Sequence, residues 1–174
     1  MKAAIMPRLI LFRHAKSDWS RDTVSDFDRT LSERGHRDAP VMGEHLSPFI
    51  QDGMNVFCSA AMRTRQTYEH AHISWPDHKV EFSPELYEVS VQKLYHFVRS
   101  QPDDRNLILI GHNPGLFMLL VMLAGYPELA DGGNPFPTAA VAVLDTESPF
   151  SHHSEHNQLT LTHYIRPRDL KQGK

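Results

Sequence analysis

Two histidines of this chain follow short apolar runs of the same kind. Residues 9–12 (Leu-Ile-Leu-Phe) lead directly into Arg13 and His14, and residues 107–110 (Leu-Ile-Leu-Ile) are followed one position later by His112. Apolar runs of this length predict strands that are buried on both faces. In open α/β sheets, ligands bind beyond the carboxyl ends of the strands. We therefore expect the two imidazoles to face one another across such a crevice.

A third run of the same type ends near a cation. Residues 54–59 predict a strand, and Arg63 follows in the first turn of the next segment. The free N–H groups at a helix start and the fork of a guanidinium both match tetrahedral oxyanions. A single histidine at a strand end is usually a structural residue, and a single arginine usually belongs to a surface ion pair. The alignment of three strand ends favours an anion site instead.

The elements that must position these side chains alternate along the sequence. Strands are predicted at residues 8–12, 54–59, 79–83, 106–111, 138–145 and 158–165. Helices are predicted between them, from Ser32 onward and at residues 60–73, 90–98 and 116–124. The polar segments 18–29 and 130–137 are predicted to be loops over one end of the sheet. This order predicts an α/β protein, a three-layer α/β/α sandwich with a mostly parallel central sheet.

Length and composition restrict the class of protein. The chain has 174 residues, 40% of them apolar and 22% charged, which predicts one globular domain over residues 1–174. A net charge of -3 supplies no positive field for nucleic acid or an acidic membrane, so any anion site must be local. The single cysteine, Cys58, excludes an internal disulfide framework and any zinc site that needs several thiolates.

Neither an export signal nor a membrane span is indicated. Pro7 and Arg8 interrupt the first apolar stretch. The longest apolar run, residues 116–125, is about half the length that a bilayer requires. Together with the single cysteine, these features predict a cytoplasmic protein.

Three common catalytic motifs are missing from the sequence. It contains no G-x-x-x-x-G-K-[ST] string, no glycine fingerprint after the first predicted strand and no G-x-S-x-G. Their absence disfavours a nucleotide kinase, a dinucleotide-dependent oxidoreductase and a hydrolase of the serine type.

Four segments carry a family resemblance. They are residues 13–17 (Arg-His-Ala-Lys-Ser), 29–35 (Arg-Thr-Leu-Ser-Glu-Arg-Gly), 59–67 (Ser-Ala-Ala-Met-Arg-Thr-Arg-Gln-Thr) and 111–115 (Gly-His-Asn-Pro-Gly). In order and spacing they resemble the motifs of the histidine phosphatase superfamily, whose fold is phosphoglycerate mutase-like. The first and last segments are similar to the SixA-type phosphohistidine phosphatase branch in particular. The resemblance covers roughly residues 8–145.

The resemblance implies a metal-independent phosphatase that uses no cofactor and works through a covalent phosphohistidine. His14 is the implied nucleophile, a role that an imidazole fills near neutral pH only when it is uncharged. The residues implied around the phosphoryl group are Arg13, Arg63, His112, Asn113 and Ser17. A protonated His112 would add its positive charge to that of the two arginines.

The sequence leaves the general acid open. Residues 86–88 (Leu-Tyr-Glu) match the spacing at which the wider superfamily carries its proton donor, which implies Glu88. Glu85 is a competing candidate nearby, and a phosphohistidine substrate needs a donor less, because imidazole departs more readily than an alkoxide. Ala15 and Ser20 stand where many small-molecule members carry glycine and asparagine, so no phosphate contact from Ser20 is expected.

Three functions follow from these residues. The implied partner is a phosphorylated protein with a histidine phosphorelay domain, since 174 residues leave little length for insertions that close over a small substrate. Segment 18–29 could still form a partial lid. A phosphatase acting on small phosphate esters is the second function. A catalytically silent phosphate-binding module is the third, and the intact set of histidines and arginines argues against it. The oligomeric state stays open.

A histidine-rich tract lies between the last two predicted strands. Residues 151–157 read Ser-His-His-Ser-Glu-His-Asn, and histidines beside a carboxylate can bind transition metals. A solvated hairpin loop explains the tract with fewer assumptions, so no metal site is predicted there.

Overall fold

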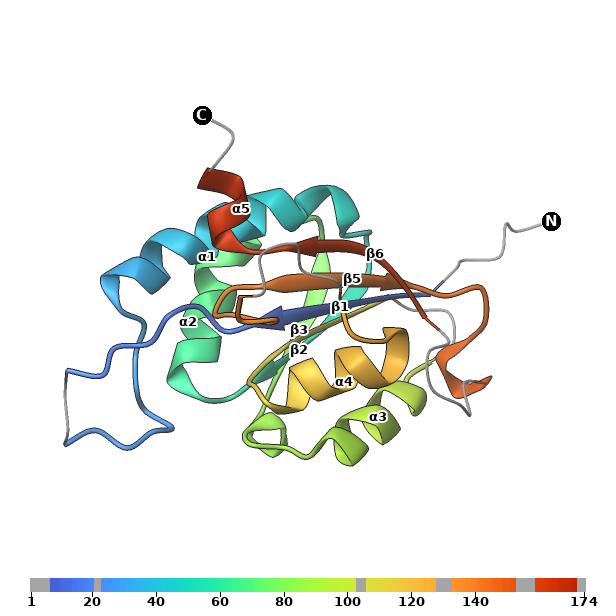
Figure 1. Cartoon of the computed structure of the whole chain (residues 1–174), viewed down its shortest axis with the longest axis horizontal. Coiled ribbons are helices and arrows are strands. Elements are labelled where there is room, and N and C mark those ends of the chain that lie inside the picture. The colour runs from blue at the N-terminus through green and yellow to red at the C-terminus, as the bar shows by residue number, and fades with distance from the viewer. Residues whose placement is uncertain (1–6, 21–22, 103–105, 128–132, 153–158, 172–174) are drawn as a thin grey trace.

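The computed structural model describes residues 7–20, 23–102, 106–127, 133–152 and 159–171. Its centre is a six-stranded sheet with the strand order β3-β2-β4-β1-β5-β6 (Figure 1). The strands are β1 (Arg8–Arg13), β2 (Met54–Ser59), β3 (His78–Ser83), β4 (Leu107–Gly111), β5 (Val141–Asp145) and β6 (Thr160–Ile165). Each of the six predicted strands is present within the described residues.

The sheet is mostly parallel, as predicted. Strand β4 pairs in parallel with both β1 and β2, and β2 pairs in parallel with β3. Strand β5 runs antiparallel to β1 and to β6. β5 begins at Val141 rather than at residue 138, because Ala139 has a left-handed backbone with a φ of 61°, which an extended strand does not allow.

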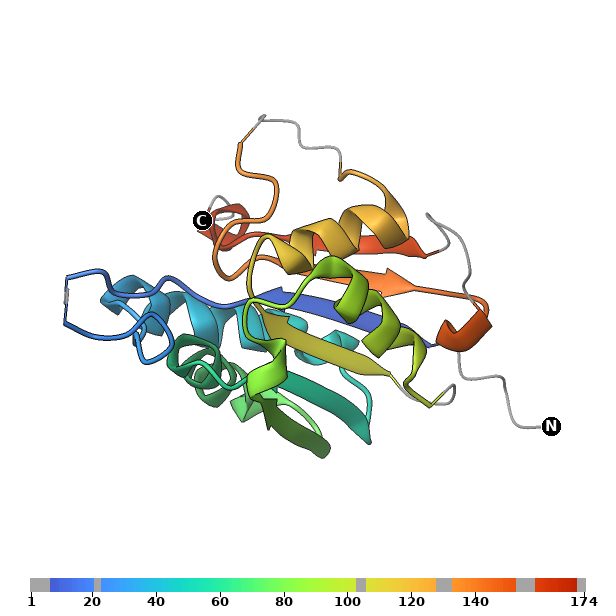
Figure 2. The ribbon, with the colours of Figure 1, turned by 90° about the horizontal axis from the view of Figure 1, so that it is seen from below.

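Helices cover both faces of the sheet, which confirms the three-layer prediction. The helices are α1 (Glu33–Leu46), α2 (Met62–Ala71), α3 (Val91–Arg99), α4 (Gly115–Ala124) and α5 (Pro167–Lys171). Figures 1 and 2 show α1 and α2 on one face of the sheet and α3 and α4 on the other. Short 3₁₀ turns lie at Ser47–Phe49, His72–Ser74, Pro84–Leu86 and Phe150–His152.

Side chains of strand β1 pack into two separate hydrophobic cores. Ile10 and Phe12 pack with residues of α1 and α2, whereas Leu9 and Leu11 pack with residues of α3 and α4. Successive side chains of a strand point to opposite faces, so a strand between two helical layers must be apolar at every position. This is why the continuous apolar run, and not an alternating one, marks β1 in the sequence.

Helix α1 is held close to the segment that follows β1. Its cap residue Ser32 accepts a hydrogen bond from the N–H of Gly35, and its own hydroxyl and N–H donate to the carbonyl of Lys16. A Cβ at Gly35 would lie 2.2 Å from that carbonyl oxygen. A residue without a side chain is therefore required for α1 to dock beside the β1 end.

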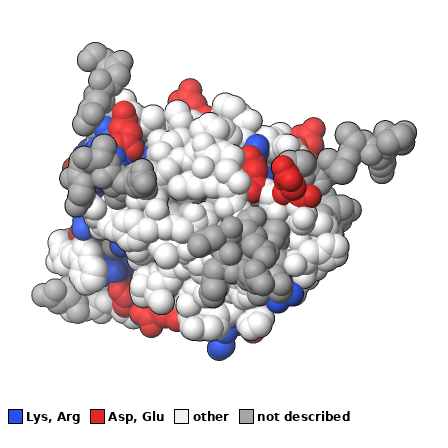
Figure 3. Space-filling view, turned by 45° about the vertical axis from the view of Figure 1, so that its right-hand side comes forward, with Lys and Arg blue, Asp and Glu red and all other residues white. Residues whose placement is uncertain are grey.

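Several sequence-based expectations fall partly outside the described residues. His153 and His156 of the histidine-rich tract lie outside them, as do parts of the segments 18–29 and 130–137. The described parts of both segments contain no regular helix or long strand. None of the described helices has the length and hydropathy that a bilayer span needs. On the face drawn in Figure 3, charged side chains of both signs are scattered rather than gathered into one basic patch.

Candidate active site

The carboxyl ends of three parallel strands bring the two histidines and the arginine together. Arg13 at the end of β1 is paired with Gly111 at the end of β4, and β2 ends beside them at Ser59. His14 directly follows β1, and His112 directly follows β4. Their ring centroids lie 5.1 Å apart, and the ring planes are tilted by 52°. The expected meeting of the two imidazoles across this sheet edge is present.

One ring nitrogen of His14 is hydrogen-bonded to the backbone, and the other is available to react. Its Nδ1 lies 2.8 Å from the carbonyl oxygen of Ala15, which assigns the proton to Nδ1 and the lone pair to Nε2. Burial, then the neighbouring His112, then the charges of Arg63 and Arg13 hold the pKa of His14 well below its usual value. At neutral pH the ring is therefore uncharged and nucleophilic.

His112 is also neutral in the unliganded protein. Its Nε2 lies 2.8 Å from the hydroxyl oxygen of Ser59, and its buried Nδ1 has no hydrogen-bond partner among the residues that the structure describes. Burial and the charge of Arg63 lower the pKa of His112 to about 3. The positive charge that a protonated His112 would supply is thus missing at neutral pH, and the arginines provide the charge of this edge.

Arg13 is fixed by a backbone carbonyl. Its guanidinium donates to the carbonyl oxygen of Phe136 at 2.8 Å, and the amide of Asn113 donates to the same oxygen at 2.9 Å. Nε of Arg13 and Oδ1 of Asn113 are buried and have no hydrogen-bond partner within the described part of the chain. Burial and the nearby Arg63 lower the pKa of Arg13, although a guanidinium stays charged in proteins. One of the two amide protons of Asn113 therefore holds the Phe136 carbonyl.

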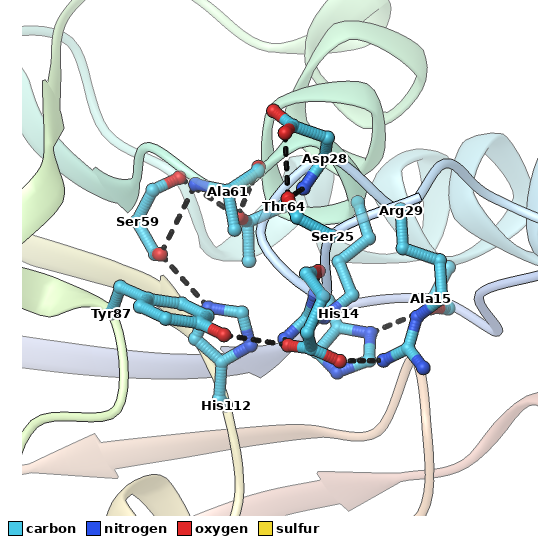
Figure 4. A network of polar contacts seen from close by, with 12 residues as sticks. His14, Ala15, Ser25, Asp28, Arg29, Ser59, Ala61, Thr64, Tyr87 and His112 are labelled. Atoms are coloured by element: carbon cyan, nitrogen blue, oxygen red, sulfur yellow. Dashed lines mark hydrogen bonds and ion pairs between the residues drawn. The ribbon is translucent and has the colours of Figure 1, made fainter. Parts of the chain in front are cut away.

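Arg63 is buried and paired with a loop residue. Its terminal nitrogens donate to the backbone oxygen of Asp26 and, at 2.9 Å, to the carboxylate of Asp26. The Tyr87 hydroxyl donates to that carboxylate at 2.7 Å, and the Tyr87 ring lies edge-on to His112. Figure 4 shows Tyr87, His112 and Arg29 arranged around His14.

Side-chain hydroxyls tie the end of β1 to helix α2. The N–H of Ala15 donates to the Thr67 hydroxyl at 2.9 Å, and that hydroxyl donates to the carbonyl of Arg63. The Thr64 hydroxyl donates to the carbonyls of Ser59 and Ala61 (Figure 4). These bonds fix the backbones that carry His14 and Arg63.

The remaining predicted site residues occupy different positions. Ser17 is buried and forms an isolated antiparallel bridge with Leu31, so it closes the base of segment 18–29. Glu88 is exposed, has a φ of 49° and lines a cavity of about 320 Å³ together with His112 and Asn113. Glu85 is exposed and is not among the residues that line this cavity. Glu88, and not Glu85, thus shares a cavity with His112.

Several site residues gave little signal in the sequence. Asp26 lies in a polar segment without periodicity, and Phe136 contributes a backbone oxygen that no residue type announces. Ser59 is visible as the end of the β2 run, but its bond to His112 is not. Tyr87 lies within the segment Leu-Tyr-Glu that carried the expectation for Glu88.

Comparison with known proteins relates the chain to one family. The model of the histidine phosphatase superfamily (branch 1) matches residues 9–101, a segment that contains His14 and Arg63. An uncharacterized protein of Mycobacterium leprae (strain TN) is 30% identical over 148 residues, which are 80% of this chain and 90% of the relative.

Solved structures share the fold over nearly the full chain. A protein assigned as the phosphohistidine phosphatase SixA from Agrobacterium tumefaciens superposes with a TM-score of 0.77 at 25% identity, covering 92% of this chain and 98% of that one. A protein assigned in the same way from Nakamurella multipartitia has a TM-score of 0.75 at 27% identity, covering 93% and 96%.

Proposed function

The chain belongs to the histidine phosphatase superfamily, and from this premise we propose that it is a metal-independent phosphatase that works through phospho-His14. Residues 1–174 act as a single histidine phosphatase domain in this proposal. One observation carries it: the His14 imidazole is neutral, has its Nδ1 proton fixed by a carbonyl, and lies beside two arginines.

In the first step, Nε2 of His14 attacks phosphorus. A P–N bond forms, the bond between phosphorus and the leaving group breaks, and the leaving group takes up one proton. Arg13 and Arg63 stabilise the charge that spreads over the phosphoryl oxygens. The buried Nδ1 of His112, which has no partner among the described residues, can meet one of those oxygens.

In the second step, a water molecule attacks the phosphorus of phospho-His14. The P–N bond breaks, Nε2 regains its lone pair, and the water proton leaves with phosphate or solvent. Asn113 supports both steps by holding the Phe136 carbonyl that also positions Arg13. Ser17 acts as a further phosphate contact in this proposal.

Glu88 is the proposed proton donor to the leaving group. Its support is its position in the wall of the cavity that His112 and Asn113 also line. A donor matters most for an alkoxide leaving group, which departs as a strong base unless it is protonated. Replacement of Glu88 should therefore slow hydrolysis of alkyl phosphates far more than hydrolysis of phosphohistidine.

Phosphohistidine on a phosphorelay protein is the proposed substrate. Its support is the similarity to two proteins assigned as phosphohistidine phosphatase SixA. A small phosphate ester is the second candidate. It is favoured by the cavity beside His112, whose apolar walls include Leu86, Leu94 and Leu116 and could hold an organic leaving group.

The deciding experiment follows phosphate release from a labelled phosphohistidine protein and from p-nitrophenyl phosphate, both in EDTA, with trapping of an acid-labile, base-stable phosphoenzyme. We expect turnover of the protein substrate and a phosphoenzyme in the wild type, and neither in His14→Ala. His36→Ala, on the exposed side of α1, is the matched control and should retain both.

The other outcomes separate the alternatives. Turnover of the small ester alone would favour the phosphomonoesterase. Stoichiometric phosphate binding with no turnover and no phosphoenzyme would leave a binding module. Full turnover by His14→Ala would remove His14 as the nucleophile.

A further inference from the structure

The carboxylate of Asp26 lies where three site residues meet. One of its oxygens, Oδ2, accepts hydrogen bonds from Arg63 at 2.9 Å and from the Tyr87 hydroxyl at 2.7 Å. The other oxygen lies 2.6 Å from a terminal nitrogen of Arg29. Guanidinium forks and hydroxyl donors around one oxyanion are also what a phosphoryl group requires. Asp26 thus occupies a set of donors suited to the substrate anion.

The two partners in this contact differ in freedom to move. The Arg63 side chain is 5% exposed and extends from helix α2, whose backbone is tied to the β1 end by hydroxyl bonds. The Asp26 side chain is 43% exposed and belongs to segment 18–29. Both terminal nitrogens of Arg63 donate to Asp26, one of them to its backbone oxygen. Substrate can gain these donors only if Asp26 yields them.

Arg29 brings a further guanidinium to the same place. Its side chain is 12% exposed, and its guanidinium carbon lies 3.4 Å from the centre of the Trp19 ring. Its Nε is buried and has no hydrogen-bond partner in the part of the chain that the structure describes. The charge of Arg29 contributes to the lowered pKa of His112, after burial and the larger effect of Arg63. Arg29 is therefore within electrostatic reach of His112.

We propose that Asp26 is an internal placeholder for the phosphoryl group, which on binding displaces the carboxylate from Arg63 and Arg29 and takes Arg29 as a third guanidinium partner. Two anions in one cradle repel each other, whereas phosphate matches the guanidinium fork better than a single carboxylate oxygen does. This inference rests on the proposed function only in naming the anion as the phosphoryl group of a substrate.

The carboxylate of Asp26 reduces the repulsion between the arginines of the unliganded site. Burial of Arg13, Arg63 and Arg29 without an anion would leave like charges side by side in a partly dehydrated pocket. Asp26 offsets that repulsion until substrate arrives. Its contribution is lost when substrate binds, so it weakens the observed affinity for phosphate.

The first test measures binding of inorganic phosphate by calorimetry to the wild type, Asp26→Ala and Asp28→Asn. Asp28 is the matched control, because it lies on the same segment and its side chain bonds to Ser25. We expect Asp26→Ala to bind phosphate about fivefold more tightly, the equivalent of one partly exposed ion pair, and Asp28→Asn to stay within about twofold. Equal or weaker binding by Asp26→Ala would overturn the proposal.

A second variant tests Arg29. In the Asp26→Ala background, Arg29→Gln should weaken phosphate binding about fivefold. No loss would overturn the assignment of Arg29 as a phosphoryl partner. Circular dichroism and thermal unfolding of each variant confirm that the fold is retained.

A third measurement follows the fluorescence of Trp19. The difference in fluorescence between the wild type and Trp19→Phe isolates the signal of Trp19, which stacks on Arg29. This signal should change as phosphate saturates the site, and Asp26→Ala should show a smaller change. A Trp19 signal that is insensitive to saturating phosphate would count against displacement.

Failure of this inference and failure of the proposed function are distinguishable, because these readouts measure binding and not turnover. A phosphoenzyme on His14 with unchanged phosphate affinity in Asp26→Ala would overturn the placeholder alone. Tighter phosphate binding in Asp26→Ala without any phosphoenzyme in the wild type would overturn the phosphatase alone.

Discussion

The molecule contains two histidine pairs with similar spacing and different surroundings. His14 and His112 lie 5.1 Å apart between their ring centroids, and His36 and His70, on helices α1 and α2, lie 4.9 Å apart. The first pair is buried, whereas the contact between His36 and His70 is exposed. Distance between two imidazoles alone therefore does not make a reactive site.

The difference lies in what each ring nitrogen contacts. Nδ1 of His36 lies 2.9 Å from Nε2 of His70, so these two exposed rings are hydrogen-bonded directly to each other. In the buried pair, a carbonyl holds His14 and a serine hydroxyl contacts His112, and one nitrogen of each ring remains for a ligand. The pair His14 and His112 is a candidate reactive site because its partners are a backbone carbonyl and a hydroxyl and because arginines lie nearby. The following variants test this comparison.

The largest effect is expected at the arginine that serves the buried pair. Arg63→Gln should lower kcat/KM by about 10² to 10³, because the proposed reaction would lose a buried donor to the phosphoryl group. Arg37→Gln, on the exposed face of α1, should change it by less than about twofold. Steady-state kinetics of both variants checks this, and a loss below about tenfold at Arg63 would contradict the assigned role.

The next largest effect on kcat/KM is expected from replacing one histidine of the buried pair, with the same replacement in the exposed pair as the control. His112→Asn should lower kcat/KM about 100-fold, because the free nitrogen beside His14 is lost. His70→Asn should leave kcat/KM unchanged, since His70 lies outside the site. Equal effects of the two variants in the same assay would show that burial does not set the pairs apart.

Acid should destabilise the fold through the buried pair. His14 and His112 have lowered pKa values in the folded protein, to about 3 for His112, against about 6.5 when unfolded. Below pH 6.5 the unfolded chain therefore binds protons that the folded chain does not. The free energy of unfolding decreases as the pH is lowered.

Urea unfolding at pH 7.5 and 5.5 measures this loss, which should be about 1 kcal/mol for each fully shifted histidine. His112→Gln should lose less than the wild type over the same interval. The same loss in both proteins would mean that His112 is not responsible. The carboxylates with lowered pKa, Asp26, Asp145 and Asp169, titrate at lower pH and do not contribute in this window.

The smallest effect is expected from removal of the exposed pair itself. His36→Ala and His70→Ala should each change the free energy of unfolding by no more than about 0.5 kcal/mol, as is usual for surface substitutions. Chemical denaturation at pH 7.5 checks this. A loss of several kcal/mol would show that the contact between α1 and α2 depends on these imidazoles.

Most of the sheet could be predicted because burial leaves a plain trace in sequence. The runs that became β1, β2 and β4 are apolar at nearly every position, as strands covered on both faces must be. Helix α5 was not predicted, since its sequence Pro-Arg-Asp-Leu-Lys is short and polar. The start of β5 was placed too early because the φ of Ala139 leaves no trace in its residue type.

The site could be predicted only where side chains sit at strand ends. His14, His112 and Arg63 follow apolar runs, so topology alone places them together. Asp26 comes from a segment whose path no periodic pattern sets, and Phe136 contributes through its backbone. The neutral state of His112 was also missed, because it depends on burial and on the nearby Arg63 charge.

The position of β4 between β1 and β2 sets the order in which the protein can mature during synthesis. His14, Ser59 and Arg63 emerge from the ribosome early, yet their two strands have no neighbour in common until residues 107–111 have been made. The nascent chain thus holds His14 in an unfinished sheet, and insertion of β4 joins the two halves of the sheet and brings His112 to the site in one event. Completion of the fold and onset of activity should coincide.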